Sequence, residues 1–374
     1  MSERGADGAA VDATVDVVAV VGTRPEIIKM APVLRALEAS PLSYRLVHTN
    51  QHYDTEMSGT FFETLSLPAP DDNLEVGSGS QAEQTAAGLV GVAGVLREAA
   101  PGVVLAQGDT NAVLSTALAA SKLPPAFGHV EAGIRSFDRT MPEEVNRVVA
   151  DHVADLAFAP TDVAAGHLAD ESVAAAVHVT GNTVVDACRE HAAIAAERSD
   201  VLERLDLVAG DYVAATIHRP GNTDDPERLR TVVTALDGAD FPVVLPAHPR
   251  TKSAIEAAGL SPTGSLRLVE PLGYLDFLEL ERNARVVVTD SGGVQEEASI
   301  LEVPCLTVRP NTERPETVDA GVNELLEPDA LAARLAEVYG DDTVHDAMTG
   351  HPELYGDGRA GERIVDLVET ELEG

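Results

Sequence analysis

Short, continuous apolar runs alternate along the chain with longer segments of helical pattern. They lie at 17–21, 44–47, 103–106, 126–130, 156–159 and 177–180, and then at 212–216, 242–245, 266–269, 286–289 and 304–308. Runs of Val, Ile, Leu and Ala without polar alternation are typical of strands covered on both faces. Helical segments such as 32–39 and 82–98 lie between them, and this alternation of strand and crossover helix predicts parallel sheets.

The two sets of runs predict two domains of the α/β class, each with a doubly wound, Rossmann-like sheet. A charged helical stretch at 192–207 separates the sets, and 374 residues suffice for two cores. A single large sheet or an eight-stranded barrel is the alternative, but eleven predicted strands with a helical linker in the middle fit two domains better. We therefore expect a disordered acidic tail at 1–14, a first domain at 15–190 and a second domain at 191–350.

Charge restricts the class of partner. With 26 basic and 62 acidic side chains, the formal net charge is −36 at pH 7, and the acids are spread through the chain. A surface this negative repels phosphate backbones and anionic lipids, so neither nucleic acid nor a membrane is an expected partner. Hydrophobic residues make up 44% of the chain, which indicates a folded protein and not an acidic disordered one.

Cysteine content and hydropathy add further exclusions. The two cysteines, Cys188 and Cys305, have no neighbour at metal-ligand spacing and are too few for a disulfide framework. No apolar stretch approaches the ~18 residues that span a bilayer, and residues 1–12 lack the basic and apolar regions of a secretory signal. We expect a cytoplasmic protein without a bound metal.

Cations follow the first predicted strand. Ligands of parallel sheets bind in the loops after the carboxyl ends of strands, and here that loop is Gly22-Thr23-Arg24-Pro25-Glu26. It contains no G-x-G-x-x-G, so a nicotinamide cofactor is not expected. Arg24 and Lys29 place two cations near a helix N-terminus, which suits a phosphate group, although Arg24 and Glu26 forming a surface pair is the simpler alternative.

Carboxylates follow later strands of the first domain. Asp109 comes after the strand at 103–106, Glu131 after the strand at 126–130, and Glu144 lies shortly beyond it. Each has a structural alternative: Asp109 suits a helix cap, and acids after Pro142 suit the first turn of a helix. Together they form a set of groups capable of acid–base catalysis.

The second domain has its own candidates. His218 and His248 follow its first and second strands at equivalent positions, which favours a function for both. Ser291–Gly293 opens a helix with exposed backbone N–H groups, an arrangement that binds anions but also occurs in ordinary strand-to-helix turns. Glu297, one turn into that helix, suits two vicinal hydroxyls such as those of ribose.

This order of motifs resembles the non-hydrolysing UDP-N-acetylglucosamine 2-epimerases, which are related in fold to two-lobed glycosyltransferases. The resemblance spans nearly the whole chain. Its most specific segments are His129-Val130-Glu131-Ala132-Gly133, Pro142-Glu143-Glu144, Asn146-Arg147, Thr180-Gly181-Asn182-Thr183, 289–297 (TDSGGVQEE) and Thr312-Glu313-Arg314-Pro315-Glu316.

The resemblance implies a glycosyltransferase-B-like fold with UDP in the cleft between two lobes, no cofactor, and a final segment, 351–374, whose helix packs back on the first lobe. It implies that the catalytic residues are Asp109, Glu131, Glu144 and His218. The implied UDP-sugar residues are Ser291, Gly292, Gly293 and Glu297 for diphosphate and ribose, Arg24, Lys29 and Arg314 for positive charge, and Leu272 and Phe277 for uracil. To these we add His248. A homodimer that supplies precursors of surface polysaccharides is a further expectation at the level of the family.

The implied reaction is reversible epimerisation of UDP-N-acetylglucosamine to UDP-N-acetylmannosamine. UDP leaves C1, a carboxylate removes the C2 proton, and the resulting 2-acetamidoglucal adds UDP again after protonation on the opposite face. A hydrolysing 2-epimerase would use the same residues, and a two-lobed glycosyltransferase would share the diphosphate site. The three carboxylates favour the epimerase, because a transferase needs at most one base in the first lobe.

The distribution of acids generates a first prediction. Acids spread over a surface are typical of proteins that remain soluble in concentrated salt, so we hypothesise a salt-rich cytoplasm. The midpoint of thermal unfolding should rise as KCl is raised from about 0.1 M to about 1 M, because screening removes self-repulsion. A protein that is fully folded and active at the lower concentration contradicts the hypothesis.

Overall fold

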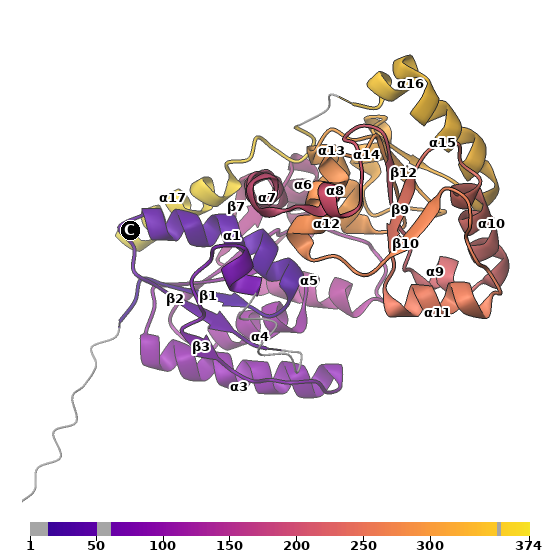
Figure 1. The fold of residues 1–374 in the computed structure, drawn as a ribbon. Coiled ribbons are helices and arrows are strands. Elements are labelled where there is room, and N and C mark those ends of the chain that lie inside the picture. The colour runs from indigo at the N-terminus through magenta and orange to yellow at the C-terminus, as the bar shows by residue number, and fades with distance from the viewer. Residues whose placement is uncertain (1–13, 51–60, 350–352) are drawn as a thin grey trace, which may run out of the picture. The chain divides into compact units, whose positions relative to one another are not determined.

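The predicted strands form two parallel sheets, one in each of two units of the chain (Figure 1). The computed structural model describes residues 14–50, 61–349 and 353–374. Unit 1 runs to Thr183 and includes Arg359–Gly374, and unit 2 is Val184–Gly358. The acidic tail expected at 1–14 lies outside the described residues except for Thr14.

In the described part of unit 1, seven parallel strands lie in the order β3-β2-β1-β4-β5-β6-β7. Their bounds are β1 Val17–Val21, β2 Tyr44–His48, β3 Asp72–Asn73, β4 Val103–Gln107, β5 Ala126–Val130, β6 Leu156–Ala159 and β7 Ala176–Val179. Every residue of β1 and β4 is buried, which explains their continuous apolar sequences.

Helices cover the strands of unit 1. Their bounds are α1 Arg24–Ala39, α3 Gln81–Ala99, α4 Asn111–Ala120, α5 Pro142–Val153, α6 Asp162–Asp170 and α17 Ala360–Glu373. Apolar side chains of α3, α4 and α5 form one core cluster with β1 and β4. The C-terminal helix α17 packs on α1, where Gly361 approaches the backbone of Pro32 so closely that a Cβ would lie 2.7 Å from its carbonyl carbon. No larger residue fits at Gly361 without moving one helix.

The sheet of unit 2 has six parallel strands among the described residues, in the order β10-β9-β8-β11-β12-β13. Their bounds are β8 Val213–Thr216, β9 Val243–Pro246, β10 Leu266–Val269, β11 Val286–Thr289, β12 Cys305–Thr307 and β13 Asn323–Leu325. Alternate residues of these strands pack into a core cluster with the helices on one face, and the residues between them into a second cluster.

Unit 2 begins with the charged stretch that separates the two sets of strands. This stretch lies in α7 (Thr183–Arg198) and α8 (Val201–Arg204). Helix α7 and unit 2 both start before the boundary expected at 190. The other helices are α9 Pro220–Thr223, α10 Pro226–Asp237, α11 Pro249–Ala257, α12 Tyr274–Arg282, α13 Gly292–Ile300, α14 Pro315–Asp319, η1 Pro328–Ala330 (3₁₀), α15 Leu331–Gly340 and α16 Asp342–Ala347.

Two doubly wound parallel sheets confirm the predicted fold class. Each predicted run forms a strand whose ends lie within one residue of those expected. The edge strands β3 and β13 were not predicted, because they are short and consist mostly of polar residues. None of the helices in the described ranges is both long and apolar enough to cross a membrane.

Candidate functional site

Strand order identifies where each unit can bind a ligand. In unit 1, β1 lies beside β4, and the connections from these two strands lead to opposite sides of the sheet order. In unit 2, β8 and β11 have the same relation. Ligands of doubly wound sheets bind in the crevice where two such loops diverge. Of the predicted functional residues, Arg24 and Asp109 follow β1 and β4, and His218 and Ser291 follow β8 and β11, so each unit has candidates on both diverging connections.

In unit 1, a buried carboxylate joins the two diverging loops. Glu26 is 2% exposed, and its Oε2 accepts hydrogen bonds from the backbone N–H of Gly22 (3.0 Å) and of Thr23 (2.6 Å). Its Oε1 accepts the hydroxyl of Thr110 from the loop after β4, at 2.7 Å. Burial raises the pKa of Glu26 to about 7. The alternative of a surface pair with Arg24 is therefore wrong.

Glu131 lies at the end of β5 in a left-handed conformation (φ 70°), which is uncommon for a residue with a side chain. The Lys29 ammonium donates to both of its carboxylate oxygens, at 2.8 and 3.1 Å, and the Gln107 amide also donates to it. The structure therefore brings together two predicted site residues that are far apart in the sequence. Arg24, in contrast, is exposed, with its guanidinium 5.8 Å from the centre of the Phe61 ring.

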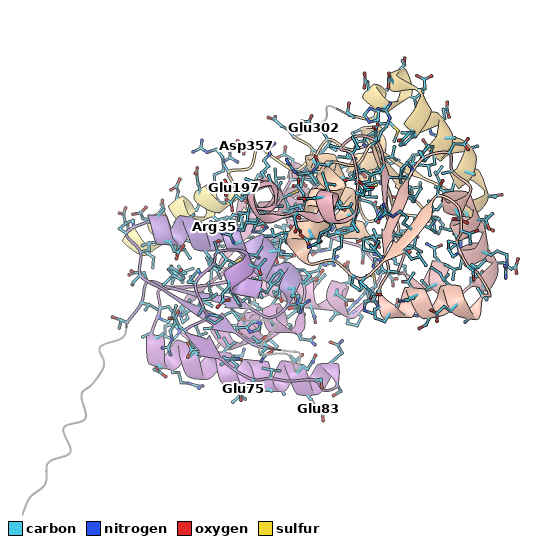
Figure 2. The ribbon with its side chains drawn as sticks, viewed as in Figure 1. Arg35, Glu75, Glu83, Glu197, Glu302 and Asp357 are labelled. Carbon is cyan, nitrogen blue, oxygen red and sulfur yellow. The ribbon has the colours of Figure 1, made fainter. Side chains whose placement is uncertain are left out.

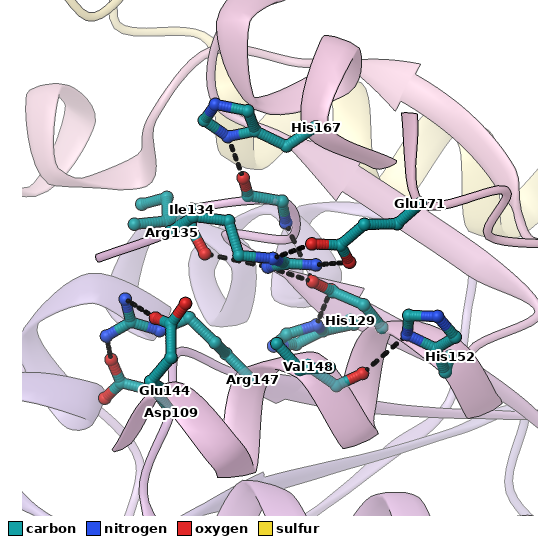
Figure 3. A network of polar contacts seen from close by, with 12 residues as sticks. Asp109, His129, Ile134, Arg135, Glu144, Arg147, Val148, His152, His167 and Glu171 are labelled. Atoms are coloured by element: carbon teal, nitrogen blue, oxygen red, sulfur yellow. Dashed lines mark hydrogen bonds and ion pairs between the residues drawn. The ribbon is translucent and has the colours of Figure 1, made fainter. Parts of the chain in front are cut away.

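Asp109 pairs with Arg147 of α5, and a third of its side chain is exposed (Figure 3). It does not cap the next helix, because Thr110 is the N-cap of α4 and its hydroxyl accepts the Ala112 N–H. The carbonyl of Asp109 also accepts the Asn146 amide at 2.9 Å. Helix α5 therefore fixes both the side chain and the backbone of Asp109.

Glu144 is 3% exposed and accepts four hydrogen bonds. Its oxygens receive the N–H and hydroxyl of Ser136, the N–H of Phe137 (each 2.9 Å) and a guanidinium N–H of Arg147 (3.0 Å). Burial alone would raise the pKa of Glu144, but these bonds and the Arg147 charge hold it below its usual value. Glu144 is thus an ionised group that shares Arg147 with Asp109, while its neighbour Glu143 is exposed.

In unit 2, the first turn of α13 is open to an anion. Ser291 is the N-cap residue but makes no side-chain cap, and the first turn contains no acidic residue. A Cβ added at Gly293 would meet no atom of another segment within 4 Å. One added at Gly292 would lie 3.7 Å from a guanidinium nitrogen of Arg219 and 3.8 Å from a carboxylate oxygen of Glu313, which pairs with that arginine. Free space, backbone N–H groups and a nearby cation together suit a phosphate or diphosphate.

Asp290 organises this loop, and the sequence analysis missed its role. It is fully buried and accepts the backbone N–H of His218 (3.1 Å) and of Arg219 (3.0 Å) and the Asn222 amide (3.1 Å). The His218 ring is half-exposed, with Nδ1 3.2 Å from the Asp290 carboxylate. Burial would raise the pKa of Asp290, but the bonds from His218 and Asn222 lower it. The sequence did contain a signal for this role, because Asp290 directly follows an apolar run and precedes Ser291-Gly292-Gly293.

Two further polar residues of unit 2 lie beside α13. Arg314 donates from Nε to Glu296 of α13 at 2.6 Å. Glu297 lies next to Tyr274 and Glu281 of α12, and it raises the pKa of both groups in addition to the larger effect of their burial. Burial and the Glu297 charge thus both favour the neutral form of Glu281, and this buried neighbour of Glu297 is a second feature that the sequence did not reveal.

The remaining predicted residues of unit 2 have less distinctive surroundings. His248 is exposed and is the N-cap of α11, where its Nδ1 accepts the Arg250 N–H at 3.4 Å. Leu272 and Phe277 are partly buried against one core cluster. This packing leaves part of each side chain at the surface.

Comparison with known proteins places this geometry in a family. A model described as UDP-N-acetylglucosamine 2-epimerase matches residues 35–369. A Methanocaldococcus jannaschii protein named UDP-N-acetylglucosamine 2-epimerase is 44% identical over 360 residues, which cover 93% of this chain and 97% of the relative. A crystal structure of the M. jannaschii enzyme in complex with UDP-GlcNAc and UDP is similar with a TM-score of 0.80 and 43% identity, covering 95% of this chain and 99% of that one.

A relative with a different named substrate is also similar. The Pseudomonas aeruginosa protein named UDP-2,3-diacetamido-2,3-dideoxy-D-glucuronate 2-epimerase is 39% identical over 357 residues, which cover 94% of this chain and 99% of the relative. The two named relatives share 2-epimerisation of a UDP sugar and differ in the sugar.

The buried Glu26 predicts an unusual dependence of stability on pH. Its pKa of about 7 in the folded state exceeds the ordinary 4.5, so its stabilising contribution is complete below 4.5 and is lost as the pH rises through about 7. A Glu26→Gln variant lacks this loss. As the pH rises from about 5 to about 8, the free energy of unfolding of the variant minus that of the wild type should increase by on the order of 2–3 kcal/mol. Urea unfolding in constant salt measures this difference.

Glu83 provides the matched control. It occupies the same capping-box position in α3, but its side chain is exposed (Figure 2). Hydrogen bonds from Ser80 lower its pKa. Its contribution is present above the ordinary value and is lost as the pH falls, so Glu83→Gln should show no gain toward alkaline pH. Equal pH dependence of the wild type and the Glu26→Gln variant would contradict the assignment.

Proposed function

This chain belongs to the UDP-N-acetylglucosamine 2-epimerase family, and from that premise we propose that it interconverts UDP-N-acetylglucosamine and UDP-N-acetylmannosamine at C2. The observation that carries the proposal is the set of acid groups in unit 1. Asp109 and Glu131 lie on loops from adjacent strands, β4 and β5, and each is paired with a cation. Proton transfer at a carbon needs such positioned carboxylates.

The acetamido sugar has no carbonyl next to C2, so direct removal of the C2 proton is unfavourable. Departure of UDP from C1 develops positive charge at C1 and thereby makes the C2 proton more acidic. We assign Asp109, Glu131 and Glu144 to proton transfer. Within this set, Asp109 and Glu131 are assigned the direct exchange of protons with C2, because Glu144 already accepts four hydrogen bonds. Addition of UDP to the 2-acetamidoglucal then completes the non-hydrolysing cycle.

Unit 2 supplies the leaving-group site in this proposal. The diphosphate binds at the open first turn of α13, at Ser291–Gly293, where backbone N–H groups stabilise the charge that develops on UDP. Arg219 adds a cation beside Gly292, and His218 lies on the same Asp290-held loop. Glu297 is assigned to the ribose, and Leu272 and Phe277 to the uracil.

Exchange of the C2 proton with solvent tests the reaction. The protein is incubated in concentrated KCl with UDP-N-acetylglucosamine in D₂O, and both sugars are followed by NMR. We expect two interconverting UDP sugars with deuterium entering at C2, because the removed proton exchanges with solvent. Accumulation of free sugar identifies a hydrolysing epimerase, and the absence of exchange without an added acceptor favours a transferase.

The Pseudomonas relative supports a second candidate substrate. UDP-2,3-diacetamido-2,3-dideoxy-D-glucuronate is therefore offered in a parallel reaction, and kcat/KM is compared for the two sugars. A higher kcat/KM with this sugar than with UDP-N-acetylglucosamine would leave the assigned reaction at C2 unchanged and would replace the assigned substrate.

Conservative substitution tests the carboxylates. Asp109→Asn, Glu131→Gln and Glu144→Gln should each lower kcat by on the order of 10²–10⁴-fold, because each removes an acid–base group. The Kd for UDP, measured by calorimetry, should change little, because the assigned UDP residues Ser291–Gly293 lie in unit 2. Glu143→Gln is the matched control, since Glu143 is the exposed neighbour of Glu144. Loss of UDP binding in all three variants would assign these residues a structural role.

A further inference from the structure

His129 of β5 lies fully buried between two hydrogen-bond acceptors. Its Nδ1 is 2.6 Å from a carboxylate oxygen of Asp151, and its Nε2 is 2.8 Å from the carbonyl oxygen of Gly108. A carbonyl oxygen can only accept, so Nε2 carries a proton. The protonation of Nδ1 therefore decides whether the ring is neutral or an imidazolium.

Asp151 settles the state of Nδ1. Its second oxygen accepts from the Arg135 guanidinium at 2.7 Å and from the Gly133 N–H at 3.2 Å. Burial alone would raise the pKa of Asp151, but the His129 and Arg135 charges lower it. An ionised Asp151 accepts the proton on Nδ1, so both ring nitrogens of His129 are donors and the ring is an imidazolium.

The charges that face this ring are balanced. Asp151 contacts it from α5, and Glu131 acts on it from the end of the same strand. Arg135 links Asp151 to Glu171, which it contacts at 2.7 and 2.9 Å. Burial by itself would lower the pKa of His129, but Asp151, the Gly108 carbonyl and Glu131 together raise it above its usual value. A cation is thus stable at this buried position.

The imidazolium holds a peptide that precedes a proposed catalytic residue. Gly108 has a φ of 85°, a conformation that favours glycine, and its N–H donates to the Val130 carbonyl at 3.1 Å. The His129 ring binds the carbonyl of the same residue. Gly108 is therefore fixed on both sides by β5, immediately before Asp109 and beside the strand end that carries Glu131.

We propose that His129, as a buried imidazolium, is a positioning residue that sets the placement of Asp109 relative to Glu131. This inference rests on the proposed function of those two carboxylates. On deprotonation the proton facing the weaker acceptor is lost: the ionised Asp151 retains Nδ1–H, so the proton leaves Nε2 and its lone pair then faces the Gly108 carbonyl. The two then repel each other, and the Asp109 loop loses its fixed position. The ordered state is complete below the ordinary histidine pKa and is lost as the pH rises through the raised value.

NMR of the wild-type protein tests the charge without reference to activity. In protein labelled with ¹⁵N-histidine at about pH 6.5, both ring nitrogens of His129 should carry protons. The backbone amide signals of Gly108 and Asp109 should titrate together with this ring. A singly protonated His129 ring at that pH, or amide signals that do not follow its titration, overturns the proposal.

Kinetics test the positioning role. His129→Gln cannot donate to both acceptors, and a misplaced Asp109 should lower kcat by about 10²-fold. KM and the Kd for UDP should stay within about threefold, because the change lies in unit 1. The alkaline decline of the wild-type kcat profile should be absent in this variant and retained in Glu26→Gln, which removes the other titrating group bonded to this loop, through Thr110. His152→Gln is the matched control, since His152 is an exposed neighbour of Asp151 whose Nδ1 bonds the Val148 carbonyl.

The outcomes separate the inference from the proposed function. Wild-type kcat in a folded His129→Gln variant, or the wild-type alkaline decline in that variant, overturns the positioning role. A wild-type protein without C2 exchange refutes the proposed function, whereas the NMR measurement still tests the imidazolium and its coupling to the Asp109 loop. If His129→Gln does not fold, the NMR titration of the wild type alone decides.

Discussion

The structure of both units depends on one constraint: a carboxylate buried at the point where the strand order reverses must receive enough donors. In unit 1, Glu26 accepts two backbone N–H groups from the loop after β1 and a hydroxyl from the loop after β4. In unit 2, Asp290 at the end of β11 accepts two backbone N–H groups from the loop after β8. Each acid joins two loops that diverge, so the ligand-binding loops have a fixed geometry before any ligand is present.

The two acids differ in their neighbours, and their pKa values shift in opposite directions. Glu26 receives only neutral donors, and burial raises its pKa to about 7. Asp290 has the His218 ring beside it and an additional amide, and its pKa is lowered in spite of burial. A buried acid therefore lies where the strand order of each sheet reverses, with a raised pKa after β1 in unit 1 and a lowered pKa after β11 in unit 2.

The sequence was sufficient for the strands and for the residues at strand ends, because both follow from local patterns. The continuous apolar runs predicted the strands of each sheet, and only the short edges β3 and β13 lacked such a run. The partners of the site residues were not predictable in this way. Lys29 and Glu131 are 102 residues apart, and nothing local links them. Glu26 did have a local signal, since Thr23 and Glu26 have capping-box spacing, which predicts a carboxylate turned back onto its own loop and away from Arg24.

The burial of the site also reconciles its charges with the acidity of the chain. In the concentrated salt that we hypothesise for a chain with a net charge of −36, screening limits self-repulsion, but the same salt weakens ion pairs that face solvent. A pair such as Lys252–Glu270, with side chains 50% and 84% exposed, contributes little under these conditions. Lys29–Glu131 is 17% and 7% exposed, and Arg147–Glu144 is 11% and 3% exposed, so ions have little access to either pair. Salt can therefore neutralise the surface while the cations of unit 1 continue to hold the carboxylates that we assign to proton transfer.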